Sequence, residues 1–131
     1  MASEKPLDHQ YRPASANNSQ ALINMKVVAD TKKLGKPFIN QLIEKFQQIS
    51  IKNINSFSQN VQDKNYKDLL EMSHQFKGMC ASAGAILMRE VCMQIEAAAR
   101  QEDEVLINTL IHNLELLLRD TIIALKQEYR V

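Results

Sequence analysis

The sequence predicts an all-α fold, an antiparallel four-helix bundle with a short additional N-terminal helix. Apolar residues recur at intervals of three and four through most of the 131-residue chain, which is the spacing of one helix face. The chain has only three glycines and three prolines, too few for an architecture of short strands and turns. The connections between the longer helical segments are short, and short connections make neighbouring helices antiparallel.

Length and composition are those of one domain. Hydrophobic residues make up 45% of the chain and charged residues 24%, as in ordinary globular proteins. Residues 1–20 are polar, so we expect a flexible N-terminal lead-in followed by a bundle domain at residues 21–131. The initiating methionine and the polar lead-in favour a free-standing protein, although a cloned fragment of a longer protein would look the same.

Charge and hydropathy exclude several classes of partner. A net charge of +1 offers no basic excess for binding nucleic acid. No apolar run approaches the roughly 18 residues of a membrane span, so we expect no direct membrane insertion. Residues 1–18 also lack the apolar region of a secretory signal. We therefore expect a cytoplasmic protein.

The first two helices are separated by a glycine and a proline. The short helix is expected at about residues 21–33, and Gly35 ends it. Pro37 suits the first turn of a long second helix, at about residues 36–63. The expected core stripe of this second helix is Phe38, Leu42, Phe46, Ile49 and Phe57, widened by Ile39, Ile43, Ile54 and Val61.

A third helix is expected at about residues 66–82, before Gly84 interrupts the pattern. Asn65 followed three residues later by Asp68 is typical of a helix start. The expected inward face is Leu69, Met72, Phe76, Met79 or Cys80, and Ala83.

The last two helices are expected at about residues 85–101 and 103–128. Cys80 and Cys92 each lie in an apolar stripe, which favours buried thiols in a reducing compartment over a disulfide. The inward residues expected are Met88, Val91, Cys92, Ile95, Ala98 and Ala99, then Leu106, Ile107, Leu110, Leu114, Leu117, Leu118, Ile122 and Leu125.

His74 is the candidate functional residue. It lies two positions from both Met72 and Phe76, about 200° around the helix from the core stripe, and should face solvent. Lys77 and Gly78, three and four residues further on, share its helix face. A glycine inside a helix costs about 1 kcal/mol relative to alanine, and access of a partner to His74 would explain it. The combination indicates phosphoryl transfer through histidine.

The segment resembles the histidine-containing phosphotransfer (HPt) domains of two-component phosphorelays. Their core pattern is similar to His74-x-x-Lys77-Gly78, with a second glycine, here Gly84, ten residues after the histidine. Met79 and Cys80 depart from the pattern, because small residues are usual there. The similarity covers the chain from about residue 21 onward and includes Leu34-Gly35, the segment 38–46, Ala85, Met88, Cys92 and Ile95-Glu96.

The resemblance implies that His74 accepts a phosphoryl group from an aspartyl phosphate on a response-regulator receiver domain and passes it to another receiver. Lys77 would stabilise the phosphoryl charge, and Gly78 would leave room for the receiver. A hybrid sensor histidine kinase would act upstream. No cofactor is expected on this chain, since Mg²⁺ would belong to the receiver. The protein would be a phosphoryl carrier without an ATP-binding module, and so not an enzyme in its own right.

Residues around His74 are candidates for contact with the receiver. Leu70 and Ala81 share the outward face of the third helix. Ile51 lies roughly 200° from Ile49 around the second helix, which leaves two interpretations open: an exposed apolar contact, or drift along a long helix.

Two residues of the fourth helix, expected at about residues 85–101, also have a spacing found in some HPt domains. A polar residue and an arginine lie near the histidine in those proteins, and Glu96 and Arg100 match their spacing. An exposed ion pair between residues four apart explains the same pattern equally well. We therefore assign neither residue a functional role from the sequence.

Three other functions could be suggested for a helical bundle with this histidine. A non-catalytic helical adaptor would bind receiver or kinase domains without transferring phosphate, but it would not need to keep both His74 and Lys77. A di-iron bundle would use Glu71 and His74 as a Glu-x-x-His motif, yet no second copy exists and both residues should point outward. A haem site with Met79 fails because Met79 and His74 lie on different helix faces. His9 and His112 lack the Lys-Gly context and are interpreted as ordinary surface residues.

Overall fold

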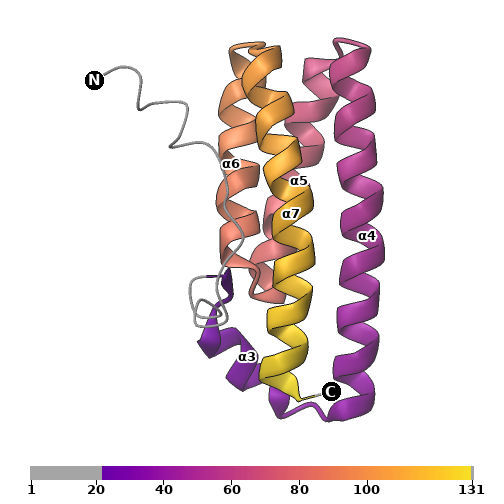
Figure 1. Ribbon diagram of the computed structural model, residues 1–131, viewed down its shortest axis with the longest axis vertical. Helices are drawn as coiled ribbons and strands as arrows, with labels where there is room; N and C mark the ends of the chain where they lie inside the picture. Colours follow the sequence, from indigo (N-terminus) through magenta and orange to yellow (C-terminus); the bar gives the residue numbers. More distant parts are fainter. Residues whose placement is uncertain (1–21, 131) are drawn as a thin grey trace, which may run out of the picture.

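Five α-helices follow one another in residues 22–130, the part of the chain that the computed structural model describes (Figure 1). The four long helices form an antiparallel bundle, and the short first helix lies below it, which confirms the predicted fold class. The expected lead-in at residues 1–20, with His9, lies outside the described residues. The helices are α3 (Met25–Lys32), α4 (Lys36–Gln62), α5 (Tyr66–Ala83), α6 (Ile86–Arg100) and α7 (Glu104–Tyr129).

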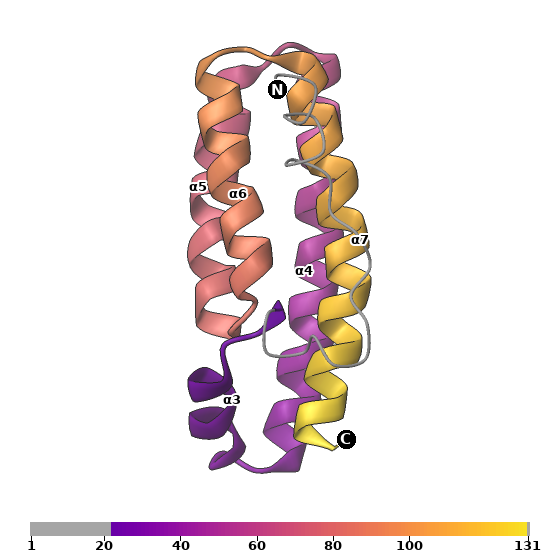
Figure 2. The same cartoon turned by 60° about the vertical axis from the view of Figure 1, so that its left-hand side comes forward.

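The four long helices are unequal, and this explains the place of α3. The pair α5 and α6 is shorter than the pair α4 and α7, so α3 lies beneath the lower ends of α5 and α6 (Figure 2). The backbone N–H of Asn24, just before α3, donates to the carbonyl of Gly84 at 2.7 Å. The turn between α5 and α6 is thereby joined to the start of α3.

Side chains at the helix starts satisfy backbone N–H groups that have no partner inside the helix. Asn24 accepts from the N–H of Lys26 at 3.0 Å. Asn65 accepts from the N–H of Asp68 at 3.2 Å, which confirms the predicted start of α5. Asp103 does the same for α7.

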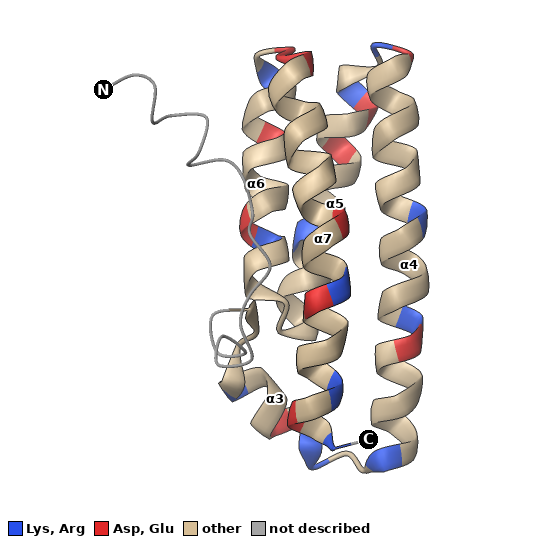
Figure 3. Ribbon diagram, viewed as in Figure 1, with Lys and Arg blue, Asp and Glu red and all other residues tan. Residues whose placement is uncertain are grey.

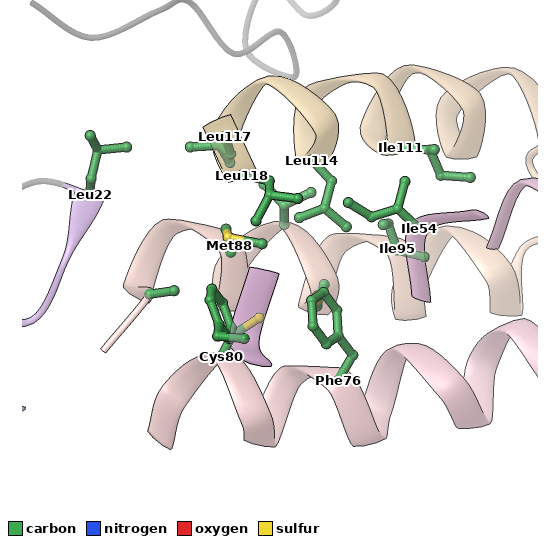
Figure 4. Packing of buried hydrophobic residues seen from close by; sticks show 14 of the residues in the cluster. Leu22, Ile54, Phe76, Cys80, Met88, Ile95, Ile111, Leu114, Leu117 and Leu118 are labelled. Carbon is green, nitrogen blue, oxygen red and sulfur yellow. The ribbon is translucent and has the colours of Figure 1, made fainter. Parts of the chain in front are cut away.

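The core is continuous through all four long helices. Phe76 of α5 points inward among residues of the other helices, including Ile54, Ile95 and Leu114 (Figure 4). Its ring stacks against Phe46 with centroids 6.4 Å apart and meets Phe57 edge-on at 6.1 Å. Close packing around Phe76 holds α5 against α4 and so sets the rotation of the helix that carries His74.

The predicted inward face of α4 is rotated relative to the observed one. Phe38 is exposed, and Leu42 and Ile49 are only partly buried. Phe46 and Phe57 of the predicted stripe are buried as expected, and the four residues expected only to widen it, together with Ser50, complete the core stripe. The buried residues of α4 are Ile39, Ile43, Phe46, Ser50, Ile54, Phe57 and Val61.

The inward face of α5 differs from the prediction at two residues. Ser73 is buried where Met72 was expected, and Met72 and Ala83 are only partly buried. Of the two residues left open, Cys80 is buried and Met79 is exposed. The observed spacing of Leu69, Ser73, Phe76 and Cys80 is that of one helix face. The small hydroxyl of Ser73 takes the place expected for a large thioether, and it donates to the carbonyl of Leu70 at 3.1 Å.

The faces of α6 and α7 follow the prediction. Every residue of α6 that we expected to be inward is buried. Of the residues expected to be inward in α7, all are buried except Leu106, which is partly exposed. Cys80 and Cys92 are free and buried, as predicted. A hydrogen bond with Cys92, together with burial, raises the pKa of Cys80, so this thiol stays protonated. Among the described helices, none has the length and apolar character needed to span a bilayer.

Candidate functional site

His74 lies near the middle of α5 and points away from the core, as predicted. Its neighbour Ser73 faces the interior with Phe76, which turns the imidazole toward the edge of α5 that adjoins α6. The side chain keeps 67% of its surface exposed. A reacting group carried by another protein can therefore reach the ring.

A carboxylate from α6 lies against this histidine. The Glu96 side chain is only 6% exposed, and its Oε2 lies 3.0 Å from Nδ1 of His74. Its other oxygen, Oε1, lies 3.0 Å from Nζ of Lys77. One buried carboxylate thus bridges two residues of α5, three positions apart, across the α5–α6 interface.

The electrostatics of Glu96 reflect two opposing effects. Burial by itself raises the pKa of Glu96, because it penalises the charged form. Hydrogen bonds from Lys77 and His74, with the charges of the same residues, outweigh burial and hold the pKa below its ordinary value. Glu96 is therefore ionised at neutral pH.

The ionised carboxylate determines which ring nitrogen of His74 carries the hydrogen. An ionised carboxylate can only accept hydrogen bonds, so Nδ1 of His74 must donate to it. In a neutral imidazole with Nδ1 protonated, Nε2 keeps its lone pair. The arrangement therefore presents Nε2 of His74 as a nucleophile.

Lys77 is less free than the sequence suggested. We expected its ammonium on the outward face beside His74, but the side chain is only 24% exposed and is paired with Glu96. An ammonium has three N–H donors, and the contact with Oε1 uses one of them. The ammonium therefore keeps donors for a further acceptor.

Gly78 has no packing reason to be a glycine. A Cβ added to it would meet nothing within 4 Å outside its own stretch of helix, and its backbone is ordinary helix. Gly84 is different, because its φ is +81° and an added Cβ would lie 3.2 Å from a methyl group of Val27. The glycine of the turn is thus explained by the fold, whereas Gly78 leaves open surface beside His74.

Glu96 is the site residue that sequence reasoning undervalued. We considered an exposed pair with Arg100, but Glu96 is buried, and Arg100 is a distant partner at 4.0 Å with most of its side chain exposed. A signal was present in the sequence. Cys92 and Ala99 lie four residues before and three after Glu96, so the carboxylate falls on the edge of an apolar face. A carboxylate there needs cationic partners, and Lys77 on the preceding helix is one.

Lys and Arg are interspersed with Asp and Glu along the described helices (Figure 3). Glu96 is distinguished from the other carboxylates by its burial. In residues 22–130, no three His, Cys, Asp or Glu side chains are grouped so that they could hold a metal ion. His112, in α7, is exposed and lies 3.6 Å from Glu115.

Comparisons with known proteins agree with this site. The sequence model of the Hpt domain matches residues 41–128, which is more than half of the chain and includes His74 and Glu96. The chain therefore belongs to the Hpt domain family, whose members are phosphocarriers of phosphorelays and not kinases. Among curated proteins, no match to the chain is found.

A solved structure shows the same fold. Histidine-containing phosphotransfer protein B (HptB) from Pseudomonas aeruginosa PAO1 superimposes with a TM-score of 0.75 and 24% sequence identity. The match covers 88% of this chain and 97% of HptB. The described helices thus have the arrangement of an HPt bundle.

Proposed function

We propose that this protein is a phosphorelay intermediate in which His74 carries the phosphoryl group between two receiver domains. The observation that carries the proposal is the exposed imidazole of His74, whose Nδ1 is bonded to a buried carboxylate. This leaves Nε2 as the nucleophile on a domain whose family performs phosphotransfer.

The transfer needs no further catalytic group on this chain. The lone pair of Nε2 attacks phosphorus, the P–O bond to the receiver's aspartate breaks, and its electron pair leaves with the carboxylate. Passing the group to a second receiver reverses these events. Phosphoryl transfer depends mainly on in-line positioning and charge stabilisation. Mg²⁺ would be held by the receiver, and the present chain would supply no cofactor.

Lys77 and Gly78 have supporting roles in this proposal. Lys77 keeps one hydrogen bond to Glu96 and donates another to the phosphoryl oxygens. Gly78 lets the receiver approach, because no side chain projects from the helix four residues after His74.

The receiver would dock on the surface around His74. Ala81 and Ile51 are exposed and Leu70 is partly exposed, so all three are available for contact. We place the exchange in the cytoplasm, with a hybrid sensor histidine kinase as the source of phosphate. A transient exchange of this kind requires only a small interface.

The test is transfer of a labelled phosphoryl group. Purified receiver domains from the same organism are phosphorylated with their kinase and labelled ATP, then mixed with the wild-type protein, His74→Gln and His112→Gln. We expect acid-labile, base-stable label on the wild type and on His112→Gln, and none on His74→Gln. His112 is a matched control because it is an exposed histidine outside the site. Undiminished labelling of His74→Gln would overturn the assignment, and binding of receivers without transfer would identify an adaptor.

A further inference from the structure

The buried charge of Glu96 calls for an explanation beyond orientation of the imidazole. A neutral glutamine at this position could accept the same hydrogen bond from Nδ1 and hold the ring in the same place. Burying an ionised carboxylate costs free energy that a neutral amide would not. Besides pairing with Lys77, the charge can act on the imidazole in a way that a neutral hydrogen-bond acceptor cannot.

The charge on the imidazole changes during phosphoryl transfer. When Nε2 of His74 bonds to phosphorus while Nδ1 keeps its hydrogen, the ring becomes cationic. If Nδ1 then loses that hydrogen, the ring is neutral, and breaking the N–P bond would release an imidazolate anion, a poor leaving group. If Nδ1 keeps it, the same bond breaks to return its electron pair to Nε2 and release a neutral imidazole.

We propose, on the basis of the function proposed above, that Glu96 holds the hydrogen on Nδ1 of phosphorylated His74 and so keeps the phosphoryl group transferable. The contact is 3.0 Å long and joins an anion to the nitrogen that carries the hydrogen. Because the carboxylate is 6% exposed, little water screens its charge from the ring. No proton is taken up or released in the transfer step itself.

Other charges near this contact moderate it without cancelling it. From α5, Lys77 bonds the opposite oxygen, Oε1, and leaves Oε2 to His74. From α6 itself, Arg100 approaches Oε2 only to 4.0 Å and is largely exposed. Within residues 22–130, no ion pair joins His74 or Glu96 to α4 or α7. The ring of His74 therefore faces one carboxylate, partly balanced by one close cation.

The test loads His74 chemically, so that it does not depend on any receiver. Potassium phosphoramidate, a phosphoryl donor for exposed histidines, is applied to wild type, Glu96→Gln and the control Glu90→Gln. Glu90 is an exposed carboxylate of the same helix and lies outside the site. After the reagent is removed, ³¹P NMR identifies the phosphorylated nitrogen and follows loss of phosphohistidine between pH 5 and pH 10.

We expect Glu96→Gln to lose its phosphoryl group more slowly than the wild type at pH 8. The rate should be about tenfold lower if the pH–rate profile is displaced by about one pH unit toward lower pH. Glu90→Gln should follow the wild type. Superimposable profiles for wild type and a folded Glu96→Gln would overturn the proposal, since they would leave the carboxylate a structural role only.

A second variant, Lys77→Gln, should have the opposite effect on the protonation of Nδ1. Lys77→Gln removes the cation that competes for Glu96, so Nδ1 of phosphorylated His74 should keep its hydrogen to higher pH than in the wild type. ¹⁵N NMR of the ring nitrogens measures the pH at which Nδ1 of phosphorylated His74 loses its hydrogen. This pH should be lower in Glu96→Gln than in the wild type. If it were unchanged or lower in Lys77→Gln, the proposal would be contradicted.

The outcomes for the two proposals are distinguishable. If no receiver transferred phosphate but chemical loading gave the expected pH profiles, only the relay function would be contradicted. If relay transfer were normal but wild type and Glu96→Gln gave identical pH profiles, only the role of Glu96 would be contradicted.

Discussion

Two residues beside His74 act on it by different physical means. Glu96 acts through charge and hydrogen bonding, because its carboxylate meets Nδ1 at 3.0 Å. Gly78 acts through the absence of a side chain, because nothing of the fold occupies the space where its Cβ would be. Local stability and function therefore make opposite demands at Gly78.

This opposition gives a prediction for Gly78→Ala. The substitution should stabilise the protein by about 0.5–1 kcal/mol, since alanine is the better helix former and meets no atom of the fold. Transfer from a phosphorylated receiver should become several-fold slower, while chemical phosphorylation by phosphoramidate stays unchanged. Urea unfolding measures the first effect and labelled transfer the second.

The control for this prediction is Gln75→Ala, at an exposed position of α5 next to His74. It should leave transfer within twofold of the wild type. If Gly78→Ala transferred as fast as Gln75→Ala, the proposed role of Gly78 in access would be wrong.

The elements are held in place by the turn between α5 and α6. Gly84 ends α5 with a left-handed backbone, and its carbonyl accepts the N–H of Asn24, so the same residue closes one helix pair and anchors α3. An added Cβ would also press on Val27 of α3. Unlike Gly78, Gly84 is required by geometry.

We therefore predict that Gly84→Ala destabilises the protein by about 1–3 kcal/mol, through left-handed strain and the contact with Val27. Thermal and urea unfolding would measure the loss. Combining it with Val27→Ala should recover only the steric part. A Gly84→Ala protein as stable as the wild type would show that the turn can relax without cost.

At the level of elements, α4 shows why the sequence could not predict which face points inward. Apolar residues occupy two overlapping stripes, one with Phe38 and Leu42 and another with Ile39 and Ile43. Helical periodicity fits both stripes, and the larger aromatic side chain favoured the wrong one. Packing of Phe46 and Phe57 around Phe76 determines the rotation of α4, and that contact lies between helices.

For the whole molecule, the bridge through Glu96 links stability to pH. Its pKa lies below the ordinary value of 4.5, so the folded state binds its proton less readily than the unfolded chain does. The stabilisation is fully present above about pH 4.5 and is lost as the pH falls through the lower folded value. Acid should therefore weaken the α5–α6 interface at this point.

The corresponding prediction compares Glu96→Gln with the wild type. Replacing the buried charge should cost about 1–2 kcal/mol at pH 6, because Lys77 and His74 lose an ionic partner. The difference should be smaller at pH 3, because acid protonates the wild-type carboxyl as the pH falls through its lowered pKa. Urea unfolding at the two pH values measures it, with Glu90→Gln as control. A difference that is equal at both values would contradict the assignment of the charge.

The sequence by itself determined the fold class, the approximate helix bounds and the outward direction of His74. These depend on periodicity, helix-starting residues and glycine, which act within a few residues of chain. It also indicated His74, Lys77 and Gly78 as a group, because residues three and four apart share a helix face. Their roles in phosphoryl transfer stay predictions that the labelling experiments test.

The tertiary structure alone decided that Glu96 is buried and joins His74 to Lys77. Glu96 follows His74 by 22 residues and lies on another helix, so their contact depends on how α5 and α6 pack. Burial of Ser73 and not of Met72 sets the rotation of α5 that turns His74 toward the carboxylate. Local spacing cannot specify such a contact, since the protonation of Nδ1 depends on an atom that only the packed bundle brings within 3.0 Å.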